Sequence, residues 1–119
     1  MKDSIVADKS KVFALHIIQL YRHLTTRECD REFVLSKQLL RSGTSIGANI
    51  KEGLRAQTRP DFILKMNIAL KEASESEYWL ELLEESNYIG KDTSDALLEE
   101  CRELIKMLVS IVKTTKENL

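Results

Sequence analysis

Proline, glycine and aromatic residues are scarce in this sequence, which has one proline, four glycines and 6% aromatic residues in 119 positions. Leucine, glutamate, lysine, isoleucine and alanine are abundant instead, which disfavours a sheet and predicts an all-α protein. No apolar run approaches the ~20 residues that a membrane-spanning helix needs. The first residues, MKDSIVADKSK, also lack the apolar core of a signal peptide. We therefore expect a cytoplasmic protein with no membrane partner.

The sequence is also poor in residues that build metal or catalytic centres. Its two cysteines, Cys29 and Cys101, lie far apart outside any C-x-x-C motif, which predicts two reduced thiols. Its two histidines are seven positions apart, which is about 10.5 Å along a helix and too far to share one metal ion. No phosphate loop, H-E-x-x-H or Ser-His-Asp signature is present, and Glu75 and Glu77 point about 200° apart on a helix. We predict no enzymatic activity, no cofactor and no metal.

The charges are unevenly divided along the chain, although the formal net charge is only -1. Residues 1–60 carry eleven Lys and Arg against six Asp and Glu, whereas residues 61–119 carry seven against thirteen. Such a division can provide a nucleic-acid surface on the basic half, or it can let unlike faces of identical subunits attract each other. The net charge does not decide between the two.

Apolar residues recur at helical spacing in four segments that short polar stretches connect. The third segment is the most regular, since its apolar and small residues alternate steps of four and three from Phe62 to Leu83 and indicate a coiled-coil-like seam. Short connections favour antiparallel neighbours. We predict one domain over residues 1–119, an antiparallel up-down-up-down four-helix bundle with helices at about 9–25, 31–54, 59–87 and 93–117.

Local signals mark the expected helix ends. Asp8 is a candidate N-cap of the first helix. Thr58 is a candidate N-cap of the third helix, because a proline and an acid follow it in the first turn. Gly90 is expected to stop the third helix, and the run DTSD at residues 92–95 is expected to cap the fourth.

The second expected helix contains three of the four glycines, within RSGTSIGANIKEG at residues 41–53. Each interior glycine costs roughly 1 kcal/mol relative to alanine, so close packing must offset that loss. Gly43 and Gly47, with Ser45 nearby, predict either close helix packing inside one subunit or a seam between subunits. Asn49 either satisfies a hydrogen bond and fixes helix register, or contacts a ligand or RNA.

Four glutamates crowd one side of the third expected helix, where like charges four residues apart destabilise a helix. They form a solvated acidic face, or they meet Arg41, Lys51 or Arg55 of the basic half on another helix or another subunit. These glutamates are Glu77, Glu81, Glu84 and Glu85.

Two segments, SKQLLRSGTSIGANIKEG and QTRPDFILKMNIALKEASESEYWLELLEESNYI, resemble the 23S ribosomal RNA intervening-sequence protein family, which consists of small bacterial four-helix bundles. The resemblance covers nearly the whole chain and is strongest from Ser36 to Ile89. The family's motif has a glutamine and an arginine, then Ser-Ile, Asn-Ile and Glu-Gly on the second helix, and acids on the third. The resemblance implies structural or interface roles for the matching residues, which are Gln38, Arg41, Ser45-Ile46, Asn49-Ile50, Glu52-Gly53, Glu75 and Glu77.

The resemblance further implies a homopentamer, a ring of five bundles around a central channel, in association with RNA or with a nucleic-acid-processing protein such as a reverse transcriptase. It implies no reaction. The alternative is a protein–protein interaction scaffold or accessory factor without direct nucleic-acid binding. If RNA is bound, cations of the basic half are the candidate contacts, namely Lys37, Arg41, Lys51, Arg55 and Arg59.

Overall fold

The computed structural model describes residues 2–118, with side chains from residue 4 onward, as four helices packed into a body of 51 × 21 × 20 Å. A single turn of 3-10 helix, η1, follows the first α-helix, and no strand occurs within residues 2–118. The elements are α1 (Lys2–Leu24), η1 (Arg27–Cys29), α2 (Val34–Leu54), α3 (Arg59–Glu85) and α4 (Lys91–Glu117).

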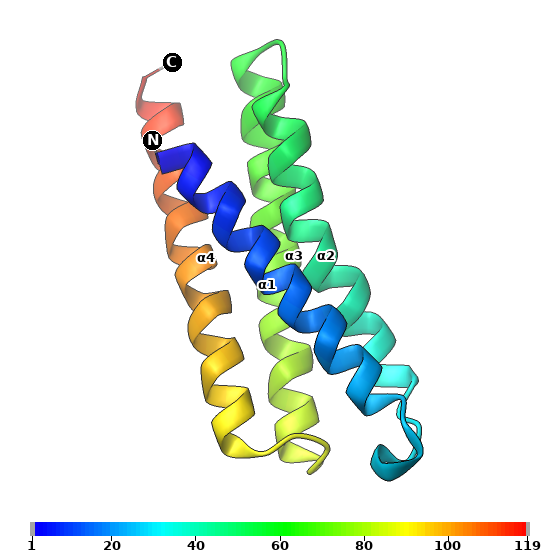
Figure 1. The fold of residues 1–119 in the computed structure, drawn as a ribbon. Coiled ribbons are helices and arrows are strands. Elements are labelled where there is room, and N and C mark those ends of the chain that lie inside the picture. Colours follow the sequence, from blue (N-terminus) through cyan, green and yellow to red (C-terminus); the bar gives the residue numbers. More distant parts are fainter. Residues whose placement is uncertain (1, 119) are drawn as a thin grey trace.

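Each helix packs on two others. Helix α3 has extensive interfaces with α2 and α4, and α1 packs on α2 and more sparsely on α4. Among the described residues, α1 does not pack on α3, nor α2 on α4. In Figure 1, α1 lies in front and α3 behind it. Both chain ends and the α2–α3 connection lie at one end of the bundle, and the other two connections lie at the opposite end.

The apolar stripes read from the sequence meet along the bundle axis. Phe13 and Ile17 of α1, Ile46 of α2 and Met66 and Leu80 of α3 are all almost completely buried. In α3 the buried positions follow the alternating steps from Met66 to Leu83, with small Ala69, Ala73 and Ser76 where neighbouring helices come close. At the start of the helix, Ile63 is buried in place of the predicted Phe62, which is half-buried. The sequence pattern therefore identifies the inner face of this helix correctly.

The first helix is longer than the sequence signals suggested. It begins at Lys2, so the predicted start near residue 9 and the role of Asp8 as N-cap are wrong. Val6 explains the extension, because it is fully buried seven residues before Phe13 and adds two turns to the same apolar stripe. Asp8 lies exposed on the outside of the helix.

The start of α2 depends on a capping residue that the sequence reading missed. Asp30 and Arg31 have left-handed backbones, with φ of 57° and 50°, so the predicted helix start at residue 31 is too early. The Glu32 carboxylate then accepts hydrogen bonds from the first backbone N–H groups of α2. The donors are Val34 N at 3.1 Å, Leu35 N at 2.8 Å and Ser36 N at 2.7 Å. Glu32 is only 7% exposed and closes this end of the helix.

The turn before α3 is capped by a side chain, whereas the turn after it depends on a left-handed backbone residue. The predicted cap at Thr58 is confirmed, because its hydroxyl accepts a hydrogen bond from Asp61 N at 3.2 Å. The predicted stop at Gly90 is wrong, since Asn87 takes the left-handed conformation, with φ of 68°, after α3 ends at Glu85. Gly90, with φ of -79°, is instead the N-cap of α4, which begins at Lys91 rather than within residues 92–95.

Candidate functional site

The glycines of α2 allow close helix approach inside this one chain. A Cβ atom on Gly43 would lie 3.1 Å from Ile17 Cγ1, and one on Gly47 would lie 3.1 Å from Ser10 Oγ, so both glycines face α1. A Cβ atom on Gly53 would lie 2.7 Å from Met66 Cε in α3. Helix α2 therefore has small residues on both flanks, and each flank packs on a neighbouring helix of the same subunit.

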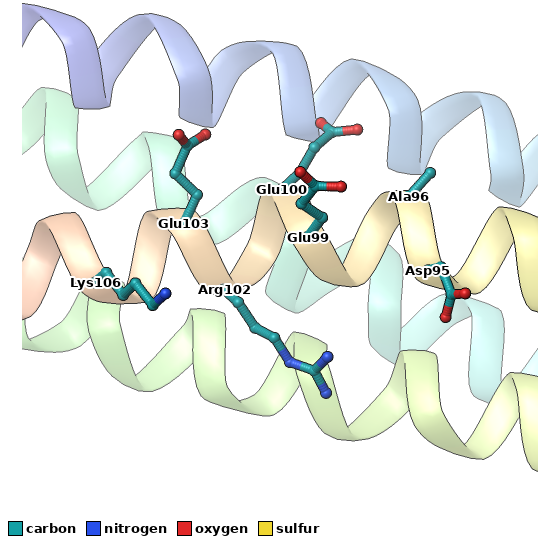
Figure 2. A pocket seen from close by; sticks show the side chains of 7 residues that line it. All are labelled: Asp95, Ala96, Glu99, Glu100, Arg102, Glu103 and Lys106. Atoms are coloured by element: carbon teal, nitrogen blue, oxygen red, sulfur yellow. The ribbon is translucent and has the colours of Figure 1, made fainter.

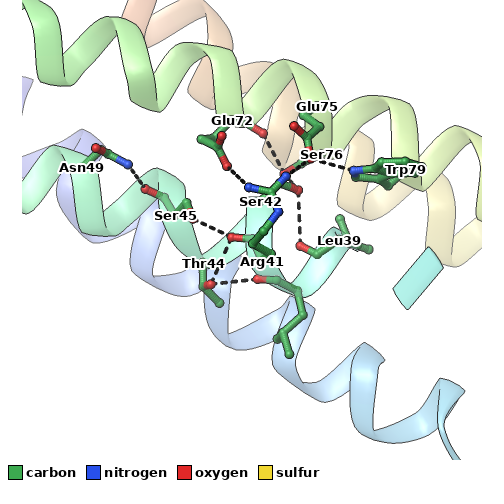
Figure 3. Close-up of polar contacts among 11 residues, drawn as sticks. Leu39, Arg41, Ser42, Thr44, Ser45, Asn49, Glu72, Glu75, Ser76 and Trp79 are labelled. Atoms are coloured by element: carbon green, nitrogen blue, oxygen red, sulfur yellow. Dashed lines mark hydrogen bonds and ion pairs between the residues drawn. The ribbon is translucent and has the colours of Figure 1, made fainter. Parts of the chain in front are cut away.

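A polar cluster joins α2 to α3 (Figure 3). Arg41 pairs through Nη1 with Glu72 Oε2 at 3.0 Å, and through Nη2 with Glu75. Glu75 also accepts a hydrogen bond from Trp79 Nε1 at 3.0 Å. The Trp79 indole lowers the pKa of Glu75, burial opposes that change, and Arg41 adds to the lowering. This arrangement keeps Glu75 ionised and turns Arg41 toward α3.

The same network continues into the helix interface through small hydroxyls. Ser42 Oγ and Ser76 Oγ are both fully buried and lie 2.8 Å apart in hydrogen-bonding contact. Half-buried Asn49 donates from Nδ2 to Ser45 O at 2.8 Å, so its amide is bonded to its own helix (Figure 3). These hydrogen bonds satisfy polar groups that burial would otherwise leave unpaired.

The remaining motif residues of α2 lie nearer the solvent. Glu52 pairs with Lys65 Nζ of α3 at 2.9 Å, while Gln38 is exposed. Of the motif positions, the structure thus brings Arg41, Glu52 and Glu75 into contacts between α2 and α3. Glu77 lies elsewhere, on the α4 side of α3.

The acidic face of α3 meets a base from α4 within the chain. Arg102 Nε lies 2.8 Å from Glu77 Oε2, and Arg102 Nη2 lies 3.7 Å from Glu81 Oε2. Inside the subunit the partner of these acids is therefore not Arg41, Lys51 or Arg55. Glu84 and Glu85 make no ion pair within the described chain.

The candidate nucleic-acid contacts divide into two groups. Arg41 is neutralised by two carboxylates, and Arg59 donates to Asn118 O. Lys37 and Lys51 of α2, and Arg55 directly after its last residue, are exposed and make no ion pair with any described residue. They form the outer cations of this helix.

The sequence reading missed a fourth cation, Lys11 of α1. It lines a groove of about 450 Å³ between α1 and α2, and Lys51 lines the same groove from α2. Its lining also includes Ala7, Ala14, Gly47, Ala48 and one acid, Asp8. Lys11 and Lys51 lie at one groove because α1 packs on α2. Local sequence patterns do not predict which helices pack on each other.

An acidic hollow lies along α4, on another side of the bundle. Its volume is about 730 Å³, and seven residues of this one helix line it. In Figure 2, Glu100 and Glu103 point toward α1 while Arg102 points toward α3. Glu100 lies 2.9 Å from His16 Nδ1, and Glu103 lies 3.1 Å from Lys9 Nζ, so part of this acidity holds α1 in place. No group of three or more His, Cys, Asp or Glu side chains is placed to hold a metal ion in the described part of the chain.

The two cysteines are free and have different surroundings. Burial raises the pKa of Cys101 to about 12, and its thiol donates to Ala73 O at 3.1 Å. Cys29 is only half-buried, and its Sγ lies 3.2 Å from His23 Nε2.

We expect an alkylating reagent at pH 8 to modify one thiol of the native protein and both thiols in denaturant. The thiolate is the reactive form, and Cys101 is both protonated and enclosed in the folded chain. Intact-mass spectrometry with iodoacetamide, on the native protein and on a Cys29→Ser variant, counts the modified thiols. Rapid labelling of native Cys29→Ser would contradict this assignment.

Four packed helices with a charged exterior define an all-α four-helix protein. Within the described residues, none of these helices has the length and apolar character of a membrane-spanning segment. Residues 2–110 match the family described as 23S rRNA-intervening sequence protein, and the chain belongs to this family. The family resemblance read from the sequence is thereby confirmed.

A solved structure supports the same placement. It is the crystal structure of a protein with unknown function from the S23 ribosomal protein family of Bacteroides thetaiotaomicron. The two chains are 54% identical and superpose with a TM-score of 0.91, covering 95% of this chain and 99% of that one. No curated protein matches the chain. Neither the family nor this structural relative is assigned an enzymatic activity.

Proposed function

We propose that this chain is a non-catalytic, homo-oligomeric bundle of the bacterial cytoplasm that binds RNA through its α1–α2 side. Its helices form an antiparallel up-down-up-down bundle, and five such subunits form the ring that the family resemblance implies. The order of ion pairs supports the topology, because Lys9 and His16 of α1 meet Glu103 and Glu100 of α4 in reverse order.

The observation that carries the RNA proposal is the set of outer cations without acid partners. Lys37, Lys51 and Arg55 follow α2, and Lys11 joins Lys51 at the groove between α1 and α2. Because carboxylates of the same chain do not neutralise them, their charge is available to phosphate groups. The family's description, 23S rRNA-intervening sequence protein, favours RNA as the source of those phosphates.

The chemistry of this surface favours backbone contacts over base reading. Lysine ammonium groups act as point charges on phosphates, and each contact releases condensed counterions. The groove lining, with its alanines, glycine and threonine, offers no aromatic ring for base stacking. We therefore expect RNA binding that depends strongly on salt and weakly on sequence.

Reversing two of the outer cations, with Lys51→Glu and Arg55→Glu together, should weaken RNA binding and flatten its salt dependence. Each lost contact to single-stranded RNA reduces the slope of log K against log salt by about 0.7, so the double variant should lose about 1.4. Fluorescence anisotropy with a labelled mixed-sequence RNA, measured over a series of salt concentrations, gives this slope.

A matched control places the same charge change on α4. Lys106→Glu with Lys113→Glu alters two exposed lysines away from the α1–α2 groove, and its slope should stay near that of the wild type. Equal slopes in both double variants would show that the outer cations of α2 contact no phosphate. No binding by the wild type at low salt would overturn the RNA proposal itself.

A second candidate is a protein scaffold without direct nucleic-acid contact, and the acidic hollow of α4 favours it. Asp95 and Glu99 line this hollow, and Glu99 makes no ion pair within the described chain. A basic segment of a partner protein would complement this surface. In that case the α4 variants, and not the α2 variants, would change partner binding.

A further inference from the structure

Helix α1 has a second apolar stripe on its outer side. Ile5, Val12 and Leu15 are 47%, 48% and 50% exposed, although isoleucine, valine and leucine are most often buried. With Asp8, Gln19 and Arg22 they occupy positions 5, 8, 12, 15, 19 and 22. These steps of three and four are the spacing of a coiled-coil seam. We call this set the α1 outer stripe.

Helix α3 has a matching stripe on its outer side. Leu64 and Tyr78 are 54% and 53% exposed, and Ile68 and Leu82 are only half-buried. With Lys71, Glu75 and Glu85, this α3 outer stripe occupies positions 64, 68, 71, 75, 78, 82 and 85, again in steps of four and three. It is separate from the inner seam of the same helix, which carries Met66, Ala73 and Leu80.

The two stripes lie on opposite sides of the subunit and have the same direction. Helices α1 and α3 do not pack on each other in the described chain, because α2 and α4 separate them. In Figure 1, both helices start at the end of the bundle that carries the chain termini. A second copy can therefore place its α3 along the α1 of the first copy in parallel, with every subunit in the same orientation. Repetition of such a contact gives a closed ring or an open helix of subunits.

We propose that the α1 outer stripe of one subunit packs in parallel on the α3 outer stripe of the next, with each α1 residue facing the α3 residue 63 positions later. In this register, two apolar pairs face each other, Ile5–Ile68 and Leu15–Tyr78, and two pairs of opposite charge meet, Asp8–Lys71 and Arg22–Glu85. The other two positions place Val12 opposite Glu75 and Gln19 opposite Leu82.

Charge selects this register over its neighbours. None of Asp8, Lys71, Arg22 and Glu85 forms an ion pair inside the described subunit, so all four can pair across the seam. A shift of one heptad in one direction places Leu15 opposite Lys71, and a shift in the other direction places Leu15 opposite Glu85. Either shift loses both charge pairs, and complementary charges are a common means of fixing helix register.

The seam and the proposed RNA surface meet at Asp8, which belongs to the α1 outer stripe and also lines the α1–α2 groove with Lys11 and Lys51. Lys37 and Lys51 of α2, and Arg55 just after it, belong to neither stripe. Glu75, which would face Val12, already has Arg41 and Trp79 as partners in its own subunit, so packing against it leaves no carboxylate unpaired.

This inference rests on the homo-oligomer of the proposed function, and charge exchange tests it. Asp8→Lys alone and Lys71→Asp alone each place like charges at the seam and should weaken assembly about tenfold. The double variant restores opposite charges and should assemble within about twofold of the wild type. Sedimentation equilibrium gives the masses, and circular dichroism checks that each variant keeps its helices.

Cross-linking tests the register directly. In a Cys29→Ser background, Leu15→Cys with Tyr78→Cys should form an intersubunit disulfide under mild copper-phenanthroline oxidation and give a ladder on a non-reducing gel. The slipped pair, Leu15→Cys with Lys71→Cys, is the control and should cross-link much less. A seam without this register would show no preference between the pairs.

The outcomes separate this inference from the function on which it rests. A monomeric wild type would overturn both the homo-oligomer and the seam. An oligomer that neither responds to the charge exchange nor forms the Leu15–Tyr78 cross-link would overturn the seam alone. Stronger cross-linking by the slipped pair would overturn the proposed register.

Discussion

Replacement of Gly43 by leucine is expected to destabilise the fold by about 3 kcal/mol. The position is tight, because even a Cβ atom there would lie 3.1 and 3.2 Å from two side-chain carbons of Ile17. Ile17 is 1% exposed and β-branched, so it cannot rotate away freely. A leucine therefore pushes α1 away from α2 at this contact.

Urea denaturation followed by circular dichroism measures this loss, and Ala48→Leu is the matched control. Ala48 lies in the same helix but is exposed, so its replacement by leucine should change the free energy of unfolding by less than about 0.5 kcal/mol. A Gly43→Leu variant as stable as the control would mean that α1 and α2 can move apart without loss of stability. That result would contradict a structural need for the close contact between Gly43 and Ile17.

The helical pattern was predictable where it depends on the local sequence. The seam of α3 and its cap at Thr58 need only neighbours within one or two turns, and both were identified. Asp8 shows how such signals mislead, because a favourable capping residue also occurs on the exposed side of a continuing helix. At Gly90, the turn already reverses through Asn87, so the glycine is not needed in a left-handed conformation.

The candidate site depends on contacts between helices, which the sequence does not contain. Arg41 faces Glu72 and Glu75 because of how α2 and α3 align, and Arg102 reaches Glu77 because of how α3 and α4 align. One chain carries eighteen bases and nineteen acids, so many pairings are consistent with its composition. Only the packed helices distinguish a cation held by a carboxylate from one available to a phosphate.

Glu32 illustrates the same limit for a single capping residue. Sequence rules favour short polar side chains at a helix start, and a glutamate two residues before α2 does not satisfy them. Here the left-handed turn at Asp30 and Arg31 directs the chain so that the longer side chain reaches forward to three N–H groups of α2. The carboxylate also meets the positive end of the helix dipole.

Glu32→Ala is therefore expected to lower the free energy of unfolding by about 2 kcal/mol, since hydrogen bonds to a charged group contribute about 1.5–3 kcal/mol. Alanine removes the acceptor for all three donors and leaves them in a site with little access to water, since Glu32 is only 7% exposed. Glu32→Gln keeps an amide oxygen but loses the charge, so its loss should be smaller. Thermal and urea unfolding measure the series.

Glu28→Ala is the matched control for Glu32→Ala. It also removes one carboxylate, but Glu28 is exposed in η1 and does not contact the start of α2. Its stability should stay within about 0.5 kcal/mol of the wild type. If Glu32→Ala were equally mild, water would replace the carboxylate at the helix start without loss. Hydrogen exchange separates the two cases, because loss of the cap should speed exchange at Val34, Leu35 and Ser36 before it affects the core of α3.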